Sequence, residues 1–198
     1  MKIIMVVVSS YLIGSIPFAY IVSRLFSHID IRAKGSGNAG ATNVLRIVGP
    51  AAGVVVLLLD IIKGLAVIKL TPLFINEGLV YLTGFAVISG HCWSPFLKFK
   101  GGKGVAVTLG VLLAIKPAYL LYAVLIWLIV FAVFKIVSLA SITSALFLPL
   151  VLIIKGEAPL VLFFITLYSA VIIFRHHQNI VKLIRGQEKK LQFSKRRK

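Results

Sequence analysis

Residues 117–134, PAYLLYAVLIWLIVFAVF, decide the class of fold, because this run contains no charged side chain. A helix that crosses a bilayer needs about 20 predominantly apolar residues. Similar apolar runs recur along the whole chain and are not confined to one anchor. The stretch therefore predicts one of several membrane-spanning helices.

The composition points the same way. The 198 residues are 60% hydrophobic and 14% charged, with a mean hydropathy of +1.04, whereas soluble domains average about 25% charged residues. The first apolar run, residues 3–26, is longer than the roughly 7–15 residues of a signal-peptide core and is expected to stay in the membrane. We therefore expect an all-α integral membrane protein that forms one domain over residues 1–198.

About seven transmembrane helices are predicted. The fourth is short and Pro117 separates it from the fifth, so these two segments could instead form a re-entrant pair. The predicted spans are residues 3–26, 51–73, 78–96, 104–116, 117–134, 136–154 and 159–176.

The charge distribution suggests an orientation. Lys and Arg number 22 against 5 Asp and Glu, for a net charge of +17. With the N-terminus outside and seven crossings, most basic residues fall in inside segments, as the positive-inside rule requires. The basic residues lie between apolar spans, which favours anionic lipid headgroups over nucleic acid as their partners. We expect an outside N-terminus and a cytoplasmic C-terminus.

The loop after the first span reads GSGNAGATNVLR, residues 35–46, and contains the pattern G-x-G-x-x-G. A dinucleotide-binding loop needs a buried strand before this pattern, and a membrane span precedes it here. Glycine-rich backbone can still form a concave nest for an anion, and an arginine can grip phosphate through two hydrogen bonds. The alternative is a flexible loop with a topology-setting arginine. The candidate residues are Gly35, Ser36, Gly37, Asn38, Gly40, Thr42, Asn43 and Arg46.

A second loop, KFKGGKGVAVT, covers residues 98–108. Gly101, Gly102 and Gly104 flank Lys103 where a membrane helix is expected to begin, and helix N-termini favour anions. The Walker A spacing is absent. This loop is therefore either a second phosphate site or a positive-inside loop whose glycines permit close packing.

The last span is expected to continue as a helix through RHHQNIVKLIRGQE, residues 175–188. His176 and Asn179 then share one helix face, and a histidine there could act as a general base. Alternatively, His176 and His177 solvate the end of a helix.

Polar residues inside the predicted spans are the last candidates for a functional role. Ser141 is a secondary site candidate, although small residues in membrane helices usually serve packing. Asp60 and Lys63 are three residues apart and are expected to pair. Adjacent helical residues point apart, so His91 and Cys92 are not expected to form a catalytic dyad. With five carboxylates in the chain, we expect no metal cage.

Two function classes fit two glycine-rich basic loops and a histidine–asparagine helix on one membrane face. One is an enzyme that transfers a lipid group to a phosphorylated metabolite. The other is a transporter of such a metabolite, which would more often show internal repeats with broken helices at the midplane. Neither feature is visible in the sequence, and the enzyme is favoured.

The three segments GSGNAGATNVLR, GHCWSPFLKFKGGKGVA and RHHQNIVKLIRGQE closely resemble the signatures of the bacterial membrane glycerol-3-phosphate acyltransferases of the PlsY type. The resemblance runs from the first loop to the tail. His177 and Gln187 stand where that family more often has arginine and threonine.

The resemblance implies transfer of a fatty acyl group from acyl phosphate to the 1-hydroxyl of sn-glycerol 3-phosphate, giving lysophosphatidic acid and phosphate, without a cofactor. It also implies a multi-pass protein of the bacterial inner membrane with a cytoplasmic active site. The oligomeric state stays open, and a monomer is compatible with this reading. By motif, the implied catalytic residues are Ser36, Arg46, Lys103, His176 and Asn179.

Overall fold

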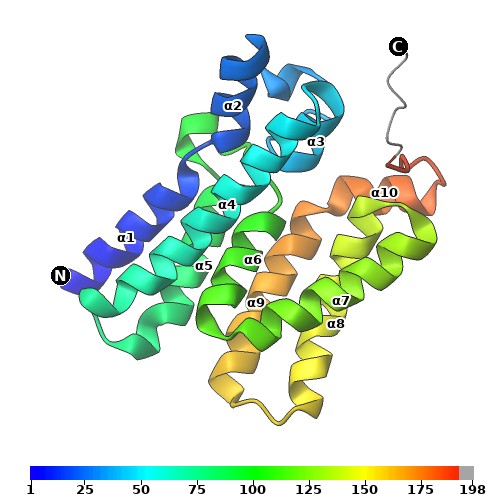
Figure 1. The fold of residues 1–198 in the computed structure, drawn as a ribbon. Helices are drawn as coiled ribbons and strands as arrows, with labels where there is room; N and C mark the ends of the chain where they lie inside the picture. Colours follow the sequence, from blue (N-terminus) through cyan, green and yellow to red (C-terminus); the bar gives the residue numbers. More distant parts are fainter. Residues whose placement is uncertain (192–198) are drawn as a thin grey trace.

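The computed structural model describes residues 1–191, which form helices joined by short connections and contain no strand (Figure 1). The α-helices are α1 Lys2–Ser15, α2 Phe18–Ser27, α3 Ala41–Ile47, α4 Pro50–Leu70, α5 Val80–Cys92, α6 Val105–Ile115, α7 Pro117–Phe134, α8 Val137–Ile154, α9 Pro159–Arg175 and α10 His177–Ile184. Short 3-10 turns cover Ile31–Ala33, Thr71–Leu73, Glu77–Leu79 and Pro95–Leu97. The all-α prediction is confirmed.

The long helices pack side by side, with α1 along α5, α4 along α6, α7 along α8, and α8 against α9. Glycines allow the closest approaches. A Cβ on Gly14 of α1 would lie 2.1 Å from the Val87 carbonyl oxygen, and one on Gly110 of α6 would lie 1.9 Å from the Ile61 carbonyl oxygen. Small residues at such crossings let helix backbones meet in a membrane bundle.

Each of the seven predicted spans contains a helix, but their lengths differ. Within residues 1–191, four segments are long and apolar enough to cross a membrane, and a fifth qualifies if α9 and α10 are taken together. The helices α5 and α6 have 13 and 11 residues, fewer than the roughly 20 that a straight crossing needs. The number of crossings stays a prediction.

The first predicted span is two helices. Proline lacks an N–H and disfavours helical geometry in the residue before it, and α1 ends just before Ile16 and Pro17. The break exposes the Ile16 carbonyl oxygen, which accepts a hydrogen bond from Lys63 on α4 at 3.1 Å.

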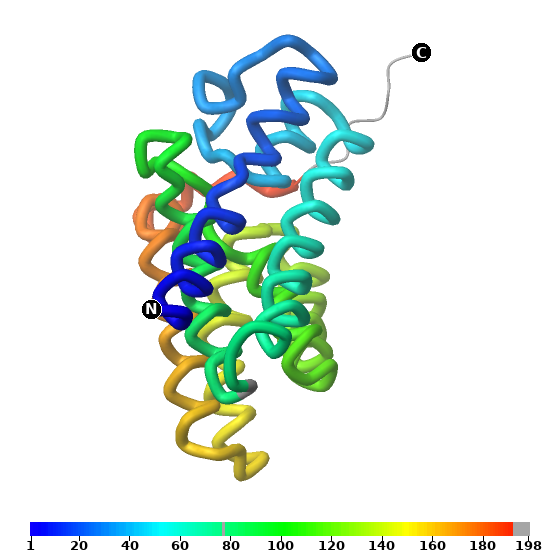
Figure 2. Tube along the Cα trace, turned by 90° about the vertical axis from the view of Figure 1, so that its left-hand side faces the viewer, coloured from blue at the N-terminus to red at the C-terminus, as the bar shows by residue number. Residues whose placement is uncertain are grey.

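The connections gather at two ends of the bundle (Figures 1 and 2). At one, which we call the glycine end, lie α3, both glycine-rich loops and α10. At the other, the distal end, Lys116 after α6 pairs with Glu157 after α8, Nζ to Oε1, at 2.6 Å. Residues 24–46, 98–103, 135 and 175–191, all predicted to lie inside, thus share one end. Residues 192–198 of the predicted inside tail lie outside the described residues, and the orientation of that end stays a prediction.

Candidate active site

Asn43 organises the first glycine loop. Its side chain is buried, and its Nδ2 donates hydrogen bonds to the carbonyl oxygens of Ile31, Lys34 and Asn38 at 3.0–3.2 Å. Its Oδ1 accepts the backbone N–H of Ser36 at 3.0 Å. A side chain that is used in this way holds the loop in shape, and the Ser36 side chain is left exposed.

The glycines of this loop are needed for its backbone. Gly35 and Gly37 have φ of 62° and 72°, values that favour glycine. After Gly40 the chain does not remain a loop but forms α3, which carries Thr42, Asn43 and Arg46. Arg46 is exposed, and its Nη2 donates to the backbone carbonyl of Lys189 at 3.3 Å.

The second glycine loop is clamped between two helix ends. The N–H of Gly101 donates to the Cys92 carbonyl at 3.2 Å, and that of Gly102 donates to the His91 carbonyl at 3.0 Å. From the other side, Arg175 at the end of α9 donates to the Gly101 and Gly102 carbonyls at 3.0 and 3.1 Å. Lys103 therefore extends from a backbone that is fixed on both sides.

The structure corrects the prediction for the third segment. The last helix does not continue straight: α9 and α10 meet at a bend of 60°. His176 lies at this bend, and its Nδ1 contacts the Ile172 carbonyl oxygen at 2.7 Å, the same oxygen that its own backbone N–H reaches. A side chain that enters the main-chain ladder is a common cause of a kink.

The histidine contact also assigns a tautomer. A carbonyl oxygen only accepts hydrogen bonds, so Nδ1 of His176 carries the proton and Nε2 is the basic nitrogen. His176 is 3% exposed. The backbone N–H of Asn179 donates to the His176 carbonyl at 2.8 Å, so the two predicted residues do lie on adjacent turns.

A chain of side chains links the second and third segments. Lys103 Nζ donates to Asn179 Oδ1, Asn179 Nδ2 donates to Glu188 Oε1 at 2.8 Å, and Ser138 Oγ donates to the same oxygen at 2.7 Å. Burial, opposed by the Glu188 carboxylate and assisted by nearby positive charges that include Arg46, lowers the pKa of Lys103 to about 8. Arg46 thus lies within electrostatic reach of Lys103.

The structure therefore brings Arg46, Lys103, His176 and Asn179 to one end of the bundle, with the Ser36 loop beside them. Ser141 is engaged elsewhere: its Oγ donates to the Val137 carbonyl at 2.9 Å and accepts from Trp127 Nε1 at 3.1 Å. No geometry tests its site role, which stays a prediction.

Sequence reasoning missed Arg175, Glu188 and Ser138 as site residues. Arg175 and Glu188 belong to the third motif, where Glu188 is its only carboxylate. That lone carboxylate among many basic residues was a usable signal. The contact with Ser138, fifty positions away, was not visible in the sequence.

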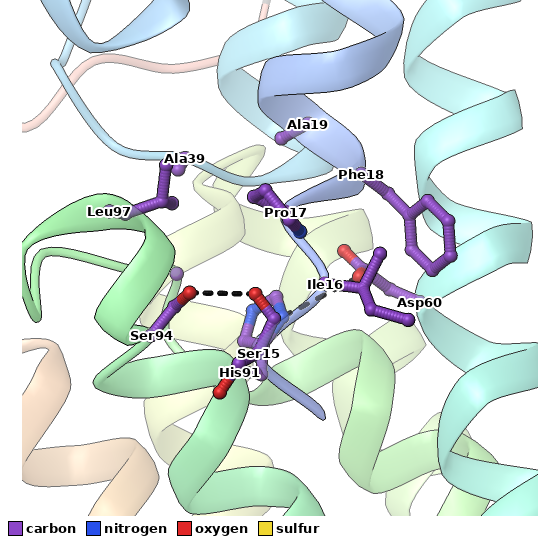
Figure 3. A pocket seen from close by; sticks show the side chains of 11 residues that line it. Ser15, Ile16, Pro17, Phe18, Ala19, Ala39, Asp60, His91, Ser94 and Leu97 are labelled. Carbon is purple, nitrogen blue, oxygen red and sulfur yellow. Dashed lines mark hydrogen bonds and ion pairs between the residues drawn. The ribbon is translucent and has the colours of Figure 1, made fainter. Parts of the chain in front are cut away.

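The pairing of Asp60 with Lys63 is confirmed, with Nζ and Oδ1 2.7 Å apart. His91 turns toward this pair and not toward a neighbouring thiol, because its Nδ1 lies 3.0 Å from Lys63 Nζ. The same nitrogen lies 3.5 Å from Asp60 Oδ1 (Figure 3). Cys92 is fully buried. Among residues 1–191, no group of histidine, cysteine and carboxylate side chains could hold a metal ion.

A family model described as glycerol-3-phosphate acyltransferase matches residues 4–186, which is nearly the whole chain. The chain belongs to the glycerol-3-phosphate acyltransferase family. Glycerol-3-phosphate acyltransferases from Desulforudis audaxviator and Aquifex aeolicus are 40% and 42% identical to it, over 98% and 95% of this chain and 98% of each relative. The resemblance seen in the three motifs is thus confirmed along the full length.

Two solved structures of PlsY, an integral membrane glycerol 3-phosphate acyltransferase, share the fold of this family member. The glycerol 3-phosphate form has a TM-score of 0.89 at 39% identity, and the lysophosphatidic acid form has 0.87 at 38%. Each comparison covers 97% of this chain and 96% of the other. Together with the apolar helices, this likeness makes the chain a multi-pass membrane protein.

Proposed function

We propose that this protein is an enzyme that transfers a fatty acyl group from acyl phosphate to the 1-hydroxyl of sn-glycerol 3-phosphate. The products are lysophosphatidic acid and inorganic phosphate. The observation that most supports this proposal is that Lys103, Arg46 and Arg175 lie beside two glycine-rich loops at one end of the bundle. Relatives named for this acyltransferase activity, and PlsY structures in glycerol 3-phosphate and lysophosphatidic acid forms, support the assignment.

The site residues match a reaction between two phosphate-bearing molecules. The glycine loops let phosphate groups approach the main chain closely because no side chains intervene, while the N–H groups of Gly101 and Gly102 themselves donate to carbonyl oxygens of the protein. Lys103 and Arg46 offset the repulsion between the two phosphates, and their charge stabilises the transition state as negative charge develops on the carbonyl and leaving oxygens. Holding both substrates in register converts the encounter into an effectively unimolecular step.

The bond changes balance without a cofactor. The hydroxyl oxygen of glycerol 3-phosphate attacks the carbonyl carbon, a C–O ester bond forms, and the C–O bond to phosphate breaks. Acyl phosphate is a mixed anhydride with a good leaving group, so the reaction needs no covalent enzyme intermediate. The hydroxyl proton goes to a phosphate oxygen of the substrate, and inorganic phosphate leaves.

In this scheme His176 and Asn179 bind and orient the substrates. Nε2 of His176 can accept a hydrogen bond from the attacking hydroxyl, and Asn179 holds the Lys103 ammonium in place. Ser36 is placed to contact a phosphate group from the first loop, and Ser141 keeps a secondary substrate role. The role of His176 can be tested with His176→Gln. If this variant loses turnover but keeps its substrate affinity, and if one pKa disappears from the pH–rate profile, His176 is instead the general base.

We place the enzyme in the bacterial inner membrane with the glycine end facing the cytoplasm, where the basic loops satisfy the positive-inside rule. Water-soluble glycerol 3-phosphate then enters from the cytoplasm, while the acyl chains of donor and product remain in the membrane.

The direct test uses purified protein in lipid vesicles with palmitoyl phosphate and glycerol 3-phosphate, following phosphate and lysophosphatidic acid together. Palmitoyl-CoA serves as the parallel donor. We expect equal release of both products from palmitoyl phosphate alone. Activity with palmitoyl-CoA alone would overturn the donor assignment, and binding of glycerol 3-phosphate by folded protein without turnover with either donor would favour a transporter.

A further inference from the structure

A charged cluster lies inside the helix bundle, apart from the substrate-facing residues. Asp60 and Lys63 on α4 and His91 on α5 are each less than a tenth exposed. Lys63 Nζ contacts Asp60 Oδ1 at 2.7 Å, His91 Nδ1 at 3.0 Å and the Ile16 carbonyl oxygen at 3.1 Å. Ionisable residues within a membrane bundle are costly and usually functional, so this cluster needs an explanation beyond packing.

The contacts define the state of the His91 ring. A lysine ammonium only donates hydrogen bonds, so His91 Nδ1 must accept, and the proton of the neutral ring resides on Nε2. The tautomer thus follows from the partner of the other nitrogen. Lys63 fixes both the orientation of the ring and the direction in which Nε2 points.

Nε2 points at the second glycine loop. A Cβ on Gly102 would lie 2.1 Å from His91 Nε2 and 2.8 Å from its Cε1, so the ring lies directly on the Gly102 backbone. The same Cβ would lie 3.0 Å from the Ala39 carbonyl oxygen of the first loop. His91 therefore touches the loop next to Lys103, at the place where the two glycine loops meet.

The surroundings of the ring support this connection. A small cavity at the break between α1 and α2 is lined by Asp60, His91, Ser94, Ala39 and Gly102 (Figure 3). Ser94 Oγ donates to the Ser15 carbonyl at 2.6 Å and holds the loop that follows α5 against α1. The buried charges and the glycine loops thus line the same small cavity, whose other walls include Ile16, Pro17 and Phe18.

We infer that His91 is a positioning residue for acyl transfer, held by Lys63 and Asp60, and that it sets the Gly102 backbone from which Lys103 reaches the phosphate. This inference rests on the proposed function. The ring acts as a spacer of defined size: Gly102 can approach it only because glycine has no side chain. Losing the ring should displace Lys103 without removing any group that touches substrate.

The test is a double-mutant cycle between His91→Ala and Gly102→Ala, with kcat and KM for glycerol 3-phosphate measured in vesicles. We expect His91→Ala to raise KM and lower kcat/KM about 10²-fold, the scale expected for a misplacement of about 1 Å. His91→Gln, which keeps a hydrogen-bonding side chain of similar length, should recover part of that loss. Gly102→Ala should be strongly defective alone, but less so when combined with His91→Ala, because the ring that the methyl group meets is gone.

A matched control is available at another contact between the α4 and α5 segments. Thr71, which follows α4, and Thr83 on α5 are both buried, and their hydroxyls are 2.9 Å apart. Thr83→Val removes a buried polar contact far from the glycine loops and should leave KM unchanged. If His91→Ala behaved like Thr83→Val, or if the two defects of the cycle simply multiplied, the positioning role would be wrong.

A binding readout separates this inference from the proposed function. Glycerol 3-phosphate should raise the unfolding temperature of the wild type, and His91→Ala should reduce that rise while Thr83→Val does not. If the wild type binds glycerol 3-phosphate but releases no product, the proposed function is refuted. The shift in unfolding temperature then still tests the role of His91. An equal rise in all three proteins would overturn the positioning role.

Discussion

The two ends of the bundle hold their cations differently. At the distal end, Lys116 pairs with the Glu157 carboxylate at 2.6 Å. At the glycine end, Lys103 donates to an amide oxygen, and Arg46 and Arg175 donate to backbone carbonyls. A carboxylate neutralises a cation, whereas a neutral acceptor orients it and leaves its charge available to an anion. The cations at the glycine end thus keep their charge, as the proposed binding of phosphate requires.

One cation at the glycine end is paired with a carboxylate, as Lys116 is at the distal end. Arg32 pairs with Asp30 at 2.7 Å, and its hydrogen bonds lower the pKa of that carboxyl to about 2. Arg32 is thereby neutralised and is absent from the candidate site. Glu188, by contrast, is separated from Lys103 by the Asn179 amide, which bonds both of them.

Removing one cation at each end gives the largest expected contrast. Lys103→Met should lower kcat/KM by about 10³-fold, the scale for loss of one group that stabilises charge in a transition state. Lys116→Met should leave kcat/KM unchanged. Steady-state kinetics in vesicles checks both, and a similar loss of kcat/KM in the two variants would contradict the difference in function between the two ends.

Asn179→Asp would place a carboxylate against Lys103, as at the distal end, and would also replace the N–H donor to Glu188 with a second carboxylate oxygen. Neutralising the ammonium should lower kcat/KM about 10²-fold, mainly through KM for glycerol 3-phosphate. Asn179→Ser, which introduces no charge, is the control. The prediction is contradicted if both substitutions give equal KM.

The pH dependence of kcat/KM should report Lys103. Burial lowers the pKa of this lysine to about 8, so the ammonium is present below that pH and is lost as the pH rises through it. The free-enzyme kcat/KM should therefore fall about tenfold per pH unit above this value. Asn179→Asp should move this alkaline limb to higher pH, because a nearby carboxylate favours the charged lysine. An alkaline limb that persisted in Lys103→Met would assign it to another group.

The smallest effect is expected at the distal pair itself. The hydrogen bond from Lys116 lowers the pKa of Glu157, so this pair contributes stability at neutral pH and loses it as the pH falls through that pKa. Glu157→Gln should leave kcat/KM unchanged and barely move Tm at neutral pH, because exposed pairs contribute little. A kinetic effect here would mean that the two ends are coupled.

Much of this architecture could be predicted from the chain alone. The apolar runs locate every long helix, and the motif residues Arg46, Lys103, His176 and Asn179 converge as expected. The bend at His176 could not be predicted, because residues 159–184 carry no proline or glycine after Pro159 to mark a break. Its cause is a side-chain contact with the helix backbone that local sequence does not specify.

Hydropathy and residue type are local properties, so the order of residues was enough to predict the all-helical membrane class and the chemistry of the three motifs. The packing of distant segments was needed to show that three cations at the glycine end meet neutral acceptors, and that the buried Asp60–Lys63–His91 cluster touches the second glycine loop. Those outcomes depend on which helix ends and carbonyl oxygens lie within about 3 Å of one another, the range of a hydrogen bond. Packing of distant segments sets that proximity.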